Sequence, residues 1–224
     1  TPSSRGLGDV YKRQEDGLYK SIEVISLYGK KRKISNEDIE GIDIIVFDIQ
    51  DVGVRFYTYL STLHYAMEAS SRTNKKIIIL DRPNPNSFYI DGPVLEIENS
   101  SFIGLHPVPI VYGMTIGEYG KMINGEGWLE NKTKANLEVI RIKNYNHNLK
   151  YEPPVRPSPN LPNLQSIYLY PSLAFLEKTE VSVGRGTKIQ FQIYGHPNFG
   201  SDFSFTPMPN FGSQYPKLNG KLSF

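Results

Sequence analysis

The sequence predicts an α/β fold that is built on a parallel β-sheet, and three segments support this prediction. Gly41–Asp51 (GIDIIVFDIQD) and Lys75–Asn86 (KKIIILDRPNPN) are rich in β-branched residues, which is typical of strands buried on both faces. Between them, Thr58–Ser71 has apolar residues at the spacing of a helix. Strand, helix and strand in this order form a right-handed unit in which the two strands are parallel.

Two shorter elements are predicted before this unit. Ser21–Gly29 (SIEVISLYG) alternates apolar and polar residues, which is typical of a strand. Ile34–Gly41 (ISNEDIEG) predicts a short helix, because Ser35 can cap its first turn and Asp38 follows three residues later.

Two further elements are predicted after the unit. Met114–Asn124 (MTIGEYGKMIN) contains the start of another helix, because Thr115 and Glu118 have the spacing of a capping box. Ala135–Ile142 (ANLEVIRI) has the composition of a strand.

A change of composition then indicates a domain boundary. Residues 144–162 contain Asn-rich turns and five prolines. Such residues break regular elements. We therefore place the boundary near residue 147, between a first domain at 15–147 and a smaller, incomplete second domain at 148–224.

The second domain is predicted to mix helix and strand. Leu164–Thr179 (LQSIYLYPSLAFLEKT) is predicted to be helical in two pieces that are broken at Pro171. Val181–Gly195 (VSVGRGTKIQFQIYG) is predicted to contain a Gly-rich turn followed by a strand.

Residues 1–14 (TPSSRGLGDVYKRQ) are predicted to be a sequencing-adapter artefact. The hexapeptide Asp9–Gln14 is what the codons GAT GTG TAT AAG AGA CAG encode, and these codons form the end of a transposon adapter used to prepare DNA libraries. Such segments are set aside before fold reasoning. The alternative is a natural, basic and flexible N-terminus.

Acidic residues follow both strands of the central unit. Asp48 and Asp51 lie at the end of the first strand, and Asp81 lies at the end of the second. Parallel α/β sheets bind ligands beyond the carboxyl ends of their strands. The placement therefore indicates a binding site, although the same carboxylates could instead cap nearby backbone amides.

Several classes of protein are disfavoured by composition and motifs. The net charge of +2 and the single basic run at Lys30–Lys33 do not indicate a nucleic-acid partner. The absence of cysteine excludes disulfides and thiolate chemistry. No segment has the roughly 20 apolar residues of a membrane helix. Neither phosphate loops nor metal-ligand spacings of histidine occur, so no cofactor and no metal are predicted.

Seven motifs occur in an order that resembles one family. They are IVFDIQDVGVRFYTYLSTL (45–63), LDRPNPN (80–86), DGPVLE (91–96), GMTIGEYG (113–120), PSPNLPN (157–163), YLYPSLAFLEKTEVSVGRGT (168–187) and FTPMPN (205–210). Together they resemble the NamZ family, the exo-β-N-acetylmuramidases of glycoside hydrolase family 171, formerly a domain of unknown function.

The resemblance implies a fold and an activity. The fold is a Rossmann-like parallel-sheet domain followed by a smaller α+β C-terminal domain. The activity is an exo-acting glycoside hydrolase that releases N-acetylmuramic acid from the non-reducing end of peptidoglycan fragments. The expected partner is a peptidoglycan glycan or muropeptide. Because peptidoglycan lies outside the cytoplasmic membrane, an exported protein, periplasmic or associated with the envelope, is expected.

The catalytic candidates are carboxylates at motif positions. Hydrolysis of a glycosidic bond needs a general acid and a second carboxylate. The positions that match the family motifs are Asp48, Asp51 and Glu177. An alternative for Asp51 is a simple ion pair with Arg55.

The substrate-binding candidates include three arginines, because the lactyl carboxylate of the substrate suits a guanidinium. The full set is Arg55, Tyr57, Tyr59, Asp81, Arg82, Asn84, Glu118, Asn160 and Arg185. Capping-box spacing also explains Glu118 without a substrate, and turn formation also explains Asn84 and Asn160.

The chain departs from the family pattern at several positions. Tyr112 stands where the family usually has His, and Leu176, Lys178 and Glu180 differ from its F-E-G-T-N-x-S segment. A Pro-Glu-His-Gly segment, whose Glu is a candidate acid, lies upstream in the family. We therefore expect the fragment alone to be inactive and poorly folded. The alternatives are an inactive muropeptide-binding relative and a small-molecule or nucleotide-binding α/β protein.

Overall fold

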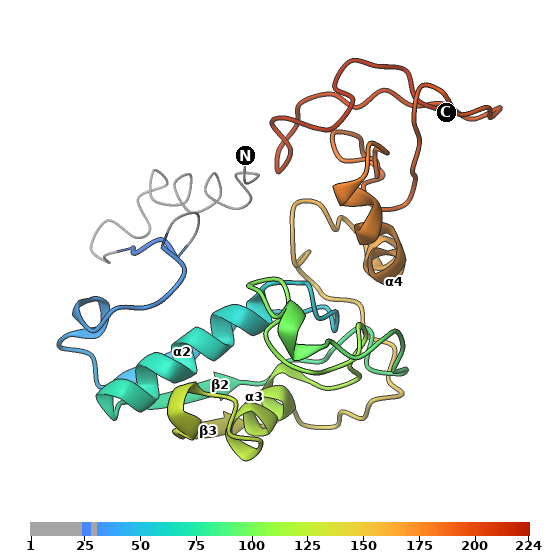
Figure 1. Ribbon diagram of the computed structural model, residues 1–224. Coiled ribbons are helices and arrows are strands. Elements are labelled where there is room, and N and C mark those ends of the chain that lie inside the picture. Colours follow the sequence, from blue (N-terminus) through green and yellow to red (C-terminus); the bar gives the residue numbers. More distant parts are fainter. Residues whose placement is uncertain (1–23, 28–30) are drawn as a thin grey trace. The chain divides into compact units, whose positions relative to one another are not determined.

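The computed structural model describes residues 24–27 and 31–224, which fall into two compact units (Figure 1). The first unit ends at Tyr151, and the second contains residues 152–224. The predicted adapter segment at 1–14 lies outside the described residues, as do Lys30 and both ends of the strand predicted at 21–29. Within that predicted strand, residues 24–27 form no regular secondary structure.

The first unit is built on three parallel strands. They are β1 (Ile44–Phe47), β2 (Lys76–Leu80) and β3 (Asn136–Ile140), in the spatial order β1-β2-β3. β1 pairs with β2 and β2 pairs with β3 in parallel register. The predicted α/β class with a parallel sheet is therefore confirmed.

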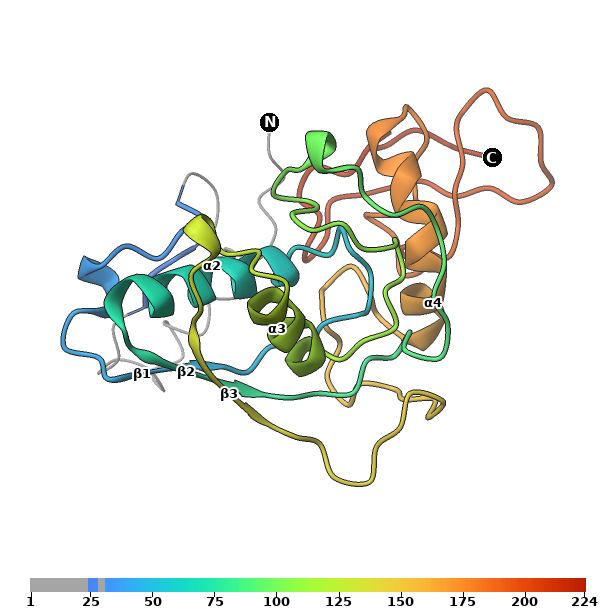
Figure 2. The same ribbon diagram turned by 60° about the horizontal axis from the view of Figure 1, so that its bottom comes forward.

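Two helices cover one face of this sheet. Helix α2 (Tyr59–Thr73) and helix α3 (Ile116–Gly125) lie on the same side of the strands (Figure 2). Ile77 and Ile79 of β2 are fully buried beneath them. Since residues two apart in a strand point to the same face, this face carries the core of the unit.

The opposite face of the sheet differs from the prediction. The runs of Ile and Val predict burial on both faces, but Ile44, Val46 and Ile140 are 47%, 57% and 47% exposed. Apolar residues therefore do stand on both faces of these strands, and only the face beneath α2 and α3 is closely packed. The prediction of two-sided burial is wrong for the part of the chain that the structure describes.

The start of α3 is fixed by the predicted capping box. The backbone N–H of Glu118 donates to Thr115 Oγ1 at 3.2 Å, and the N–H of Thr115 donates to Glu118 Oε2 at 2.9 Å. Two amides that the first turn leaves without partners are thereby satisfied. The local sequence was sufficient to place this helix.

Short 3-10 helices complete the first unit. They are η1 (Glu37–Ile39), η2 (Ile97–Asn99) and η3 (Glu130–Lys132). At η1 the predicted capping pair is present, because Ser35 N–H donates to Asp38 Oδ2 at 2.8 Å and Asp38 N–H to Ser35 Oγ at 3.4 Å.

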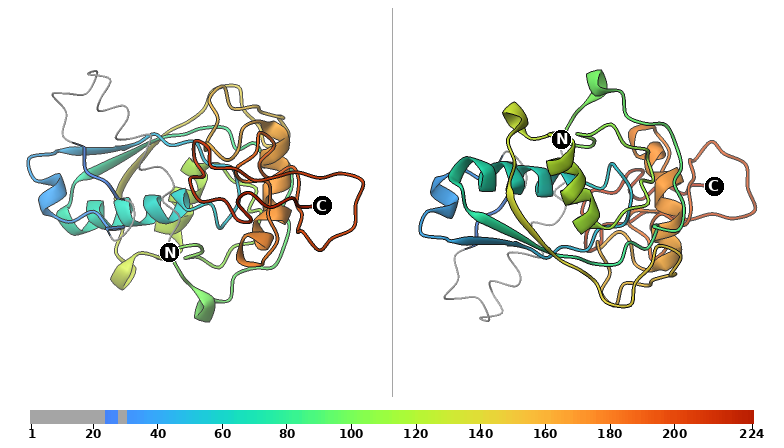
Figure 3. Two further views of the ribbon diagram at one scale, coloured as in Figure 1. Left: turned by 90° about the horizontal axis from the view of Figure 1, so that it is seen from above. Right: turned by 90° about the horizontal axis from the view of Figure 1, so that it is seen from below.

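The second unit is mostly irregular. Helix α4 (Leu164–Leu173) runs directly into η4 (Ala174–Lys178), and long loops lead from there to the C-terminus (Figure 3). The break falls after Leu173, and Pro171 lies inside α4, so the predicted break at Pro171 is wrong.

The strand predicted within Val181–Gly195 is also wrong. Residues 181–195 form turns, with an isolated antiparallel bridge between Ser182 and Gly195 and a backbone hydrogen bond from Phe191 to Val183 at 2.9 Å. Phe191 of this segment instead turns inward, where its ring packs edge-on against Tyr170 with centroids 5.0 Å apart. No helix among the described residues has the length and apolar character needed to cross a bilayer.

Candidate functional site

An exposed ion pair marks the carboxyl ends of two neighbouring strands. Asp48 follows β1 and Arg82 follows β2. Asp48 Oδ1 accepts from Nε and Nη2 of Arg82, each at 2.7 Å. The side chains are 44% and 38% exposed, so both groups remain open to a ligand. This is the edge at which parallel α/β sheets bind their ligands.

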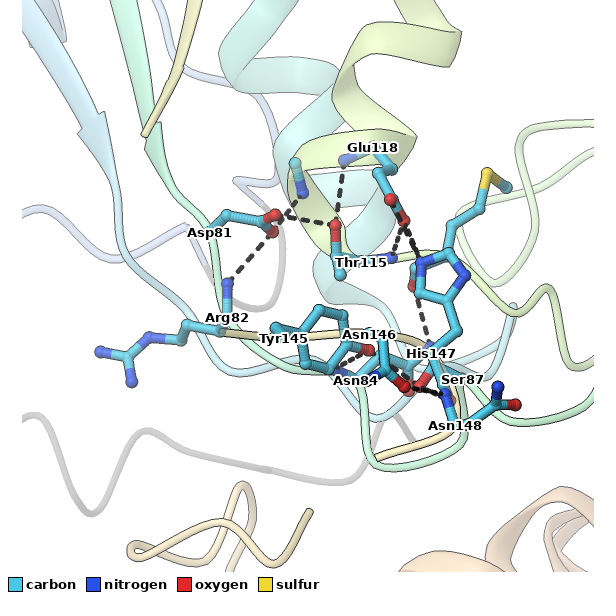
Figure 4. Close-up of polar contacts among 12 residues, drawn as sticks. Asp81, Arg82, Asn84, Ser87, Thr115, Glu118, Tyr145, Asn146, His147 and Asn148 are labelled. Carbon is cyan, nitrogen blue, oxygen red and sulfur yellow. Dashed lines mark hydrogen bonds and ion pairs between the residues drawn. The ribbon is translucent and has the colours of Figure 1, made fainter. Parts of the chain in front are cut away.

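Asp81 holds the start of α3 in place next to this pair (Figure 4). Its carboxylate accepts from Thr115 Oγ1 and from the Gly117 N–H, both at 2.8 Å, and from the Arg82 N–H at 3.1 Å. A Cβ on Gly117 would come within 2.7 Å of Asp81 Cγ, so only glycine permits this approach. Partial burial raises the pKa of the Asp81 carboxyl. Asp81 therefore ties the end of β2 to α3.

Glu118 holds a histidine that the sequence did not place at the site. His147 Nε2 lies 3.1 Å and 2.9 Å from the two carboxylate oxygens of Glu118. The two side chains are 45% and 44% exposed (Figure 4). His147 belongs to the Asn-rich turn NYNHN. A lone histidine is more often structural, so no sequence pattern selects it.

Buried amides fix the loop that follows β2. Asn84 is 3% exposed, and its Nδ2 donates to the Met114 carbonyl at 2.8 Å while its Oδ1 accepts from the Asn86 N–H at 2.8 Å. Both ends of the Asn84 amide are thus engaged within the protein. The geometry matches the turn role that is the alternative for Asn84.

Asp51 is buried, and it does not pair with Arg55. Its Oδ2 accepts from the Gly53 N–H at 2.7 Å and from the Tyr112 hydroxyl. Arg55 instead donates to the carbonyls of Pro93, at 2.9 Å, and Val108. The proposed Asp51–Arg55 ion pair is therefore absent from the described residues. Tyr112, which replaces the usual histidine of the family motif, has become the partner of this carboxyl.

Burial sets the ionisation of these groups. Asp51 is 4% exposed, and desolvation raises the pKa of its carboxyl to about 6. Burial also raises the pKa of the Tyr112 phenol and lowers the pKa of the Arg55 guanidinium. A buried Asp51 that is partly protonated near neutral pH positions its neighbours, and only a movement of the chain would bring it to a substrate.

Tyr57 and Tyr59 lie beside each other at the start of α2. Their rings pack edge-on, with centroids 5.1 Å apart and planes at 89°. Both side chains are partly exposed.

Three predicted residues meet in the second unit. Arg185 Nη1 donates to Glu177 Oε1 at 2.8 Å, and Arg185 Nη2 donates to the Gly212 carbonyl at 3.3 Å. Asn160 Nδ2 donates to the same carbonyl at 2.9 Å. The side chains of Arg185 and Glu177 are only 14% and 15% exposed. Glu177 is thereby held beside the guanidinium of Arg185.

The family of the chain is shown by two sequence profiles. The profile described as exo-beta-N-acetylmuramidase NamZ, N-terminal, matches residues 8–165, and the corresponding C-terminal profile matches residues 168–220. The chain belongs to the NamZ family.

One similar curated protein and two similar solved structures support this membership of the NamZ family. The peptidoglycan beta-N-acetylmuramidase NamZ of Bacillus subtilis (strain 168) is 42% identical over 199 residues, which cover 85% of this chain and 47% of that protein. A DUF1343 family crystal structure from Bacteroides fragilis is 48% identical with a TM-score of 0.83, over 85% of this chain and 54% of its own. A second from the same organism is 31% identical with a TM-score of 0.79, over 89% and 56%. The chain spans about half the length of each.

Seven of the twelve residues predicted for this NamZ-family chain form two groups, one in each unit, and Asp51, Arg55, Tyr57, Tyr59 and Asn84 make other contacts. The first unit brings Asp48, Asp81, Arg82 and Glu118 to the region where β2 ends and α3 begins. The second unit brings together Asn160, Glu177 and Arg185. Among the residues that the structure describes, no three His, Asp or Glu side chains gather as they would around a metal ion.

Proposed function

We propose that this chain is part of an exo-acting glycoside hydrolase that releases N-acetylmuramic acid from the non-reducing end of peptidoglycan fragments. The proposal is supported by the two NamZ profiles, which together extend over residues 8–220. It is also supported by the B. subtilis relative, whose name gives that substrate class. A substrate of this kind places the activity outside the cytoplasmic membrane, so we propose an exported protein that acts in the cell envelope.

The exposed Arg82–Asp48 pair is the observation that carries the proposal. N-acetylmuramic acid bears a carboxylate on its lactyl group, and this carboxylate needs a cationic partner that N-acetylglucosamine does not need. Of the three candidate arginines, Arg55 donates to backbone carbonyls and Arg185 is largely buried against Glu177. Arg82 has a side chain that is 38% exposed, against 14% for Arg185, and its guanidinium has five N–H donors. The donors that Asp48 does not use make no hydrogen bond within the described residues.

Asp48 is the most accessible of the three catalytic candidates. Its side chain is 44% exposed and stands at the carboxyl end of β1. Its Oδ1 accepts from Arg82, and a carboxylate at this edge could stabilise the positive charge that develops on the sugar. We propose Asp48 for this role, with Asp51 and Glu177 as positioning carboxylates.

The first test is a direct assay of the natural full-length protein. We expect it to release nitrophenol from nitrophenyl β-N-acetylmuraminide and to leave the corresponding N-acetylglucosaminide uncleaved. Cleavage of neither substrate by a folded protein would contradict the proposed function. Cleavage of both at similar rates would contradict the specificity for the lactyl group.

The role of Arg82 predicts a substrate-dependent loss. An Arg82→Met variant is expected to lose roughly 30-fold in kcat/KM for the muraminide, since a charged hydrogen bond contributes about 2 kcal/mol. Arg82→Lys keeps the charge without the bidentate geometry and is expected to fall between this variant and the wild type. An Arg82→Met variant whose KM for the muraminide equals that of the wild type would contradict a role of Arg82 in substrate binding.

A further inference from the structure

The Glu118–His147 pair has the construction of an acid–base dyad. Glu118 is fixed at the N-terminus of α3, where its Oε2 accepts from the Thr115 N–H at 2.9 Å. A negative charge is favourable at a helix N-terminus. Both carboxylate oxygens then lie within 3.1 Å of His147 Nε2. The helix therefore anchors the carboxylate, and the carboxylate orients the imidazole.

This contact determines which nitrogen of His147 carries the proton. An ionised carboxylate only accepts hydrogen bonds, so the nitrogen that faces Glu118 must be the N–H. In the neutral imidazole, Nδ1 then has the lone pair. Figure 4 shows this second nitrogen turned away from Glu118. No described residue makes a hydrogen bond to Nδ1, and the side chain is 45% exposed.

The backbone around His147 is also held in place. Ser87 Oγ donates to the His147 carbonyl at 2.9 Å, and the Tyr145 hydroxyl donates to Ser87 Oγ at 2.8 Å. Ser87 belongs to the loop that follows β2. The dyad thus stands at the carboxyl edge of the sheet, in the same unit as Asp48 and Arg82, on a segment whose position is fixed by hydrogen bonds.

We propose that His147 is the general base of the glycoside hydrolase, and this inference rests on the function proposed above. A base whose orientation is set by a third group is the usual arrangement for activating a nucleophile. Nδ1 takes a proton from water, and the water oxygen bonds to the anomeric carbon. The glycosidic C–O bond breaks, and its electron pair goes to the leaving oxygen, which takes a proton from a carboxylic acid of the site. Solvent then removes the proton from the imidazolium. Glu118 is a positioning residue for this step.

The mechanism has a pH signature with a defined sign. The base must be unprotonated to accept the proton of water, so kcat/KM falls on the acid side of the pH profile. The side chains that face His147 are Glu118, which accepts from Nε2, and Tyr145, whose ring centroid lies 5.9 Å from that of the imidazole. Burial raises the pKa of the Tyr145 phenol, so it stays neutral on the acid side of the profile.

The test compares two variants of the natural full-length protein on the muraminide substrate. His147→Gln is the informative change, because its amide N–H₂ can still donate to Glu118 while nothing remains at the position of Nδ1. We expect kcat to fall roughly 100-fold, the low end for general base catalysis, with KM nearly unchanged and the acid limb of the pH profile lost. The Glu118→Gln variant is expected to keep the acid limb of the pH profile and to lose less activity than His147→Gln. The melting temperatures of both variants show whether they fold.

The outcomes distinguish a failure of the general-base assignment from a failure of the proposed function. An active wild type together with a His147→Gln variant that keeps its rate and its acid limb would overturn the base assignment alone. An inactive, folded wild type would overturn both this inference and the proposed function. Direct attack of water also requires inversion at the anomeric carbon, so a product that first appears in proton NMR as the β-anomer would overturn the assignment.

Discussion

Replacing Asp51 by asparagine is expected to stabilise the protein by up to about 3 kcal/mol at pH 7 and to leave its stability unchanged near pH 4. Burial raises the pKa of the Asp51 carboxyl from 3.8 to about 6. Each pKa unit corresponds to about 1.4 kcal/mol. Between these values the folded state binds more protons than the unfolded state, so stability falls as the pH rises. Because asparagine does not ionise, the Asp51→Asn variant does not lose this stability as the pH rises.

A buried histidine makes the opposite contribution. His106 is 3% exposed, and burial lowers the pKa of its imidazole from 6.5 to about 3. Between these two pKa values the unfolded state binds more protons than the folded state, so the free energy of unfolding rises with pH. As the pH falls through this range, the free energy of unfolding decreases by about 5 kcal/mol in total. Between about pH 4 and pH 6 the contributions of Asp51 and His106 nearly cancel in the wild type.

The hydrogen bonds around His106 explain why it stays neutral. Glu68 accepts from His64 Nε2 at 3.1 Å, which leaves His64 Nδ1 to accept from His106 Nε2 at 3.0 Å. His106 Nδ1 then accepts from the Tyr119 hydroxyl, also at 3.0 Å. The hydrogen bonds thus run in one direction, from Tyr119 through His106 and His64 to Glu68. A second proton on His106, at Nδ1, would point at the hydroxyl group that donates to it. The ring of Trp128 stacks on the imidazole, with centroids 4.6 Å apart, and contributes to its burial.

Urea unfolding between pH 4 and pH 7 measures both contributions. The difference between Asp51→Asn and wild type is expected to grow with pH. The matched variant His106→Gln is expected to show the reverse, with its deficit relative to wild type growing with pH. Differences from wild type that do not depend on pH would contradict the assignment of both buried groups.

Local sequence was enough to predict the elements whose causes are local. Thr115 and Glu118 are three residues apart, and their capping box sets the start of α3 without reference to the rest of the chain. Asp48 and Asp81 could be placed at the same edge of the sheet because the carboxyl ends of parallel strands lie at one edge. The βαβ order thus predicted both the fold class and the position of part of the candidate site.

The contacts that the sequence did not reveal join residues far apart in the chain. The partner of Asp51 is Tyr112, 61 residues away, and the partner of Glu118 is His147, 29 residues away. Nothing local distinguishes a buried aspartate from an exposed one in DIQD. The strand predicted after Val181 failed for a related reason, because the apolar Phe191 is used for packing against α4.

Replacing Arg185 by methionine is expected to destabilise the protein by about 3 kcal/mol, because the largely buried carboxylate of Glu177 loses its ion pair with the guanidinium. The pair is 2.8 Å apart, and the two side chains are 14% and 15% exposed. The Gly212 carbonyl also loses one of its two donors, although Asn160 continues to donate to it. Arg82→Met is the matched control, since its partner Asp48 is 44% exposed and an exposed pair contributes about 1 kcal/mol or less.

The double variant Glu177→Gln with Arg185→Met tests whether the pair acts in catalysis or in folding. Removing both charges takes away the buried carboxylate that has lost its Arg185 partner, so most of the lost stability should return in urea unfolding. If muraminide cleavage returns as well, the pair serves to hold the loop at Gly212. If stability returns and cleavage does not, Glu177 contributes to the chemistry from its own unit. If the double variant is as unstable as Arg185→Met alone, the loss of stability comes from the lost contact with Gly212 rather than from the carboxylate of Glu177.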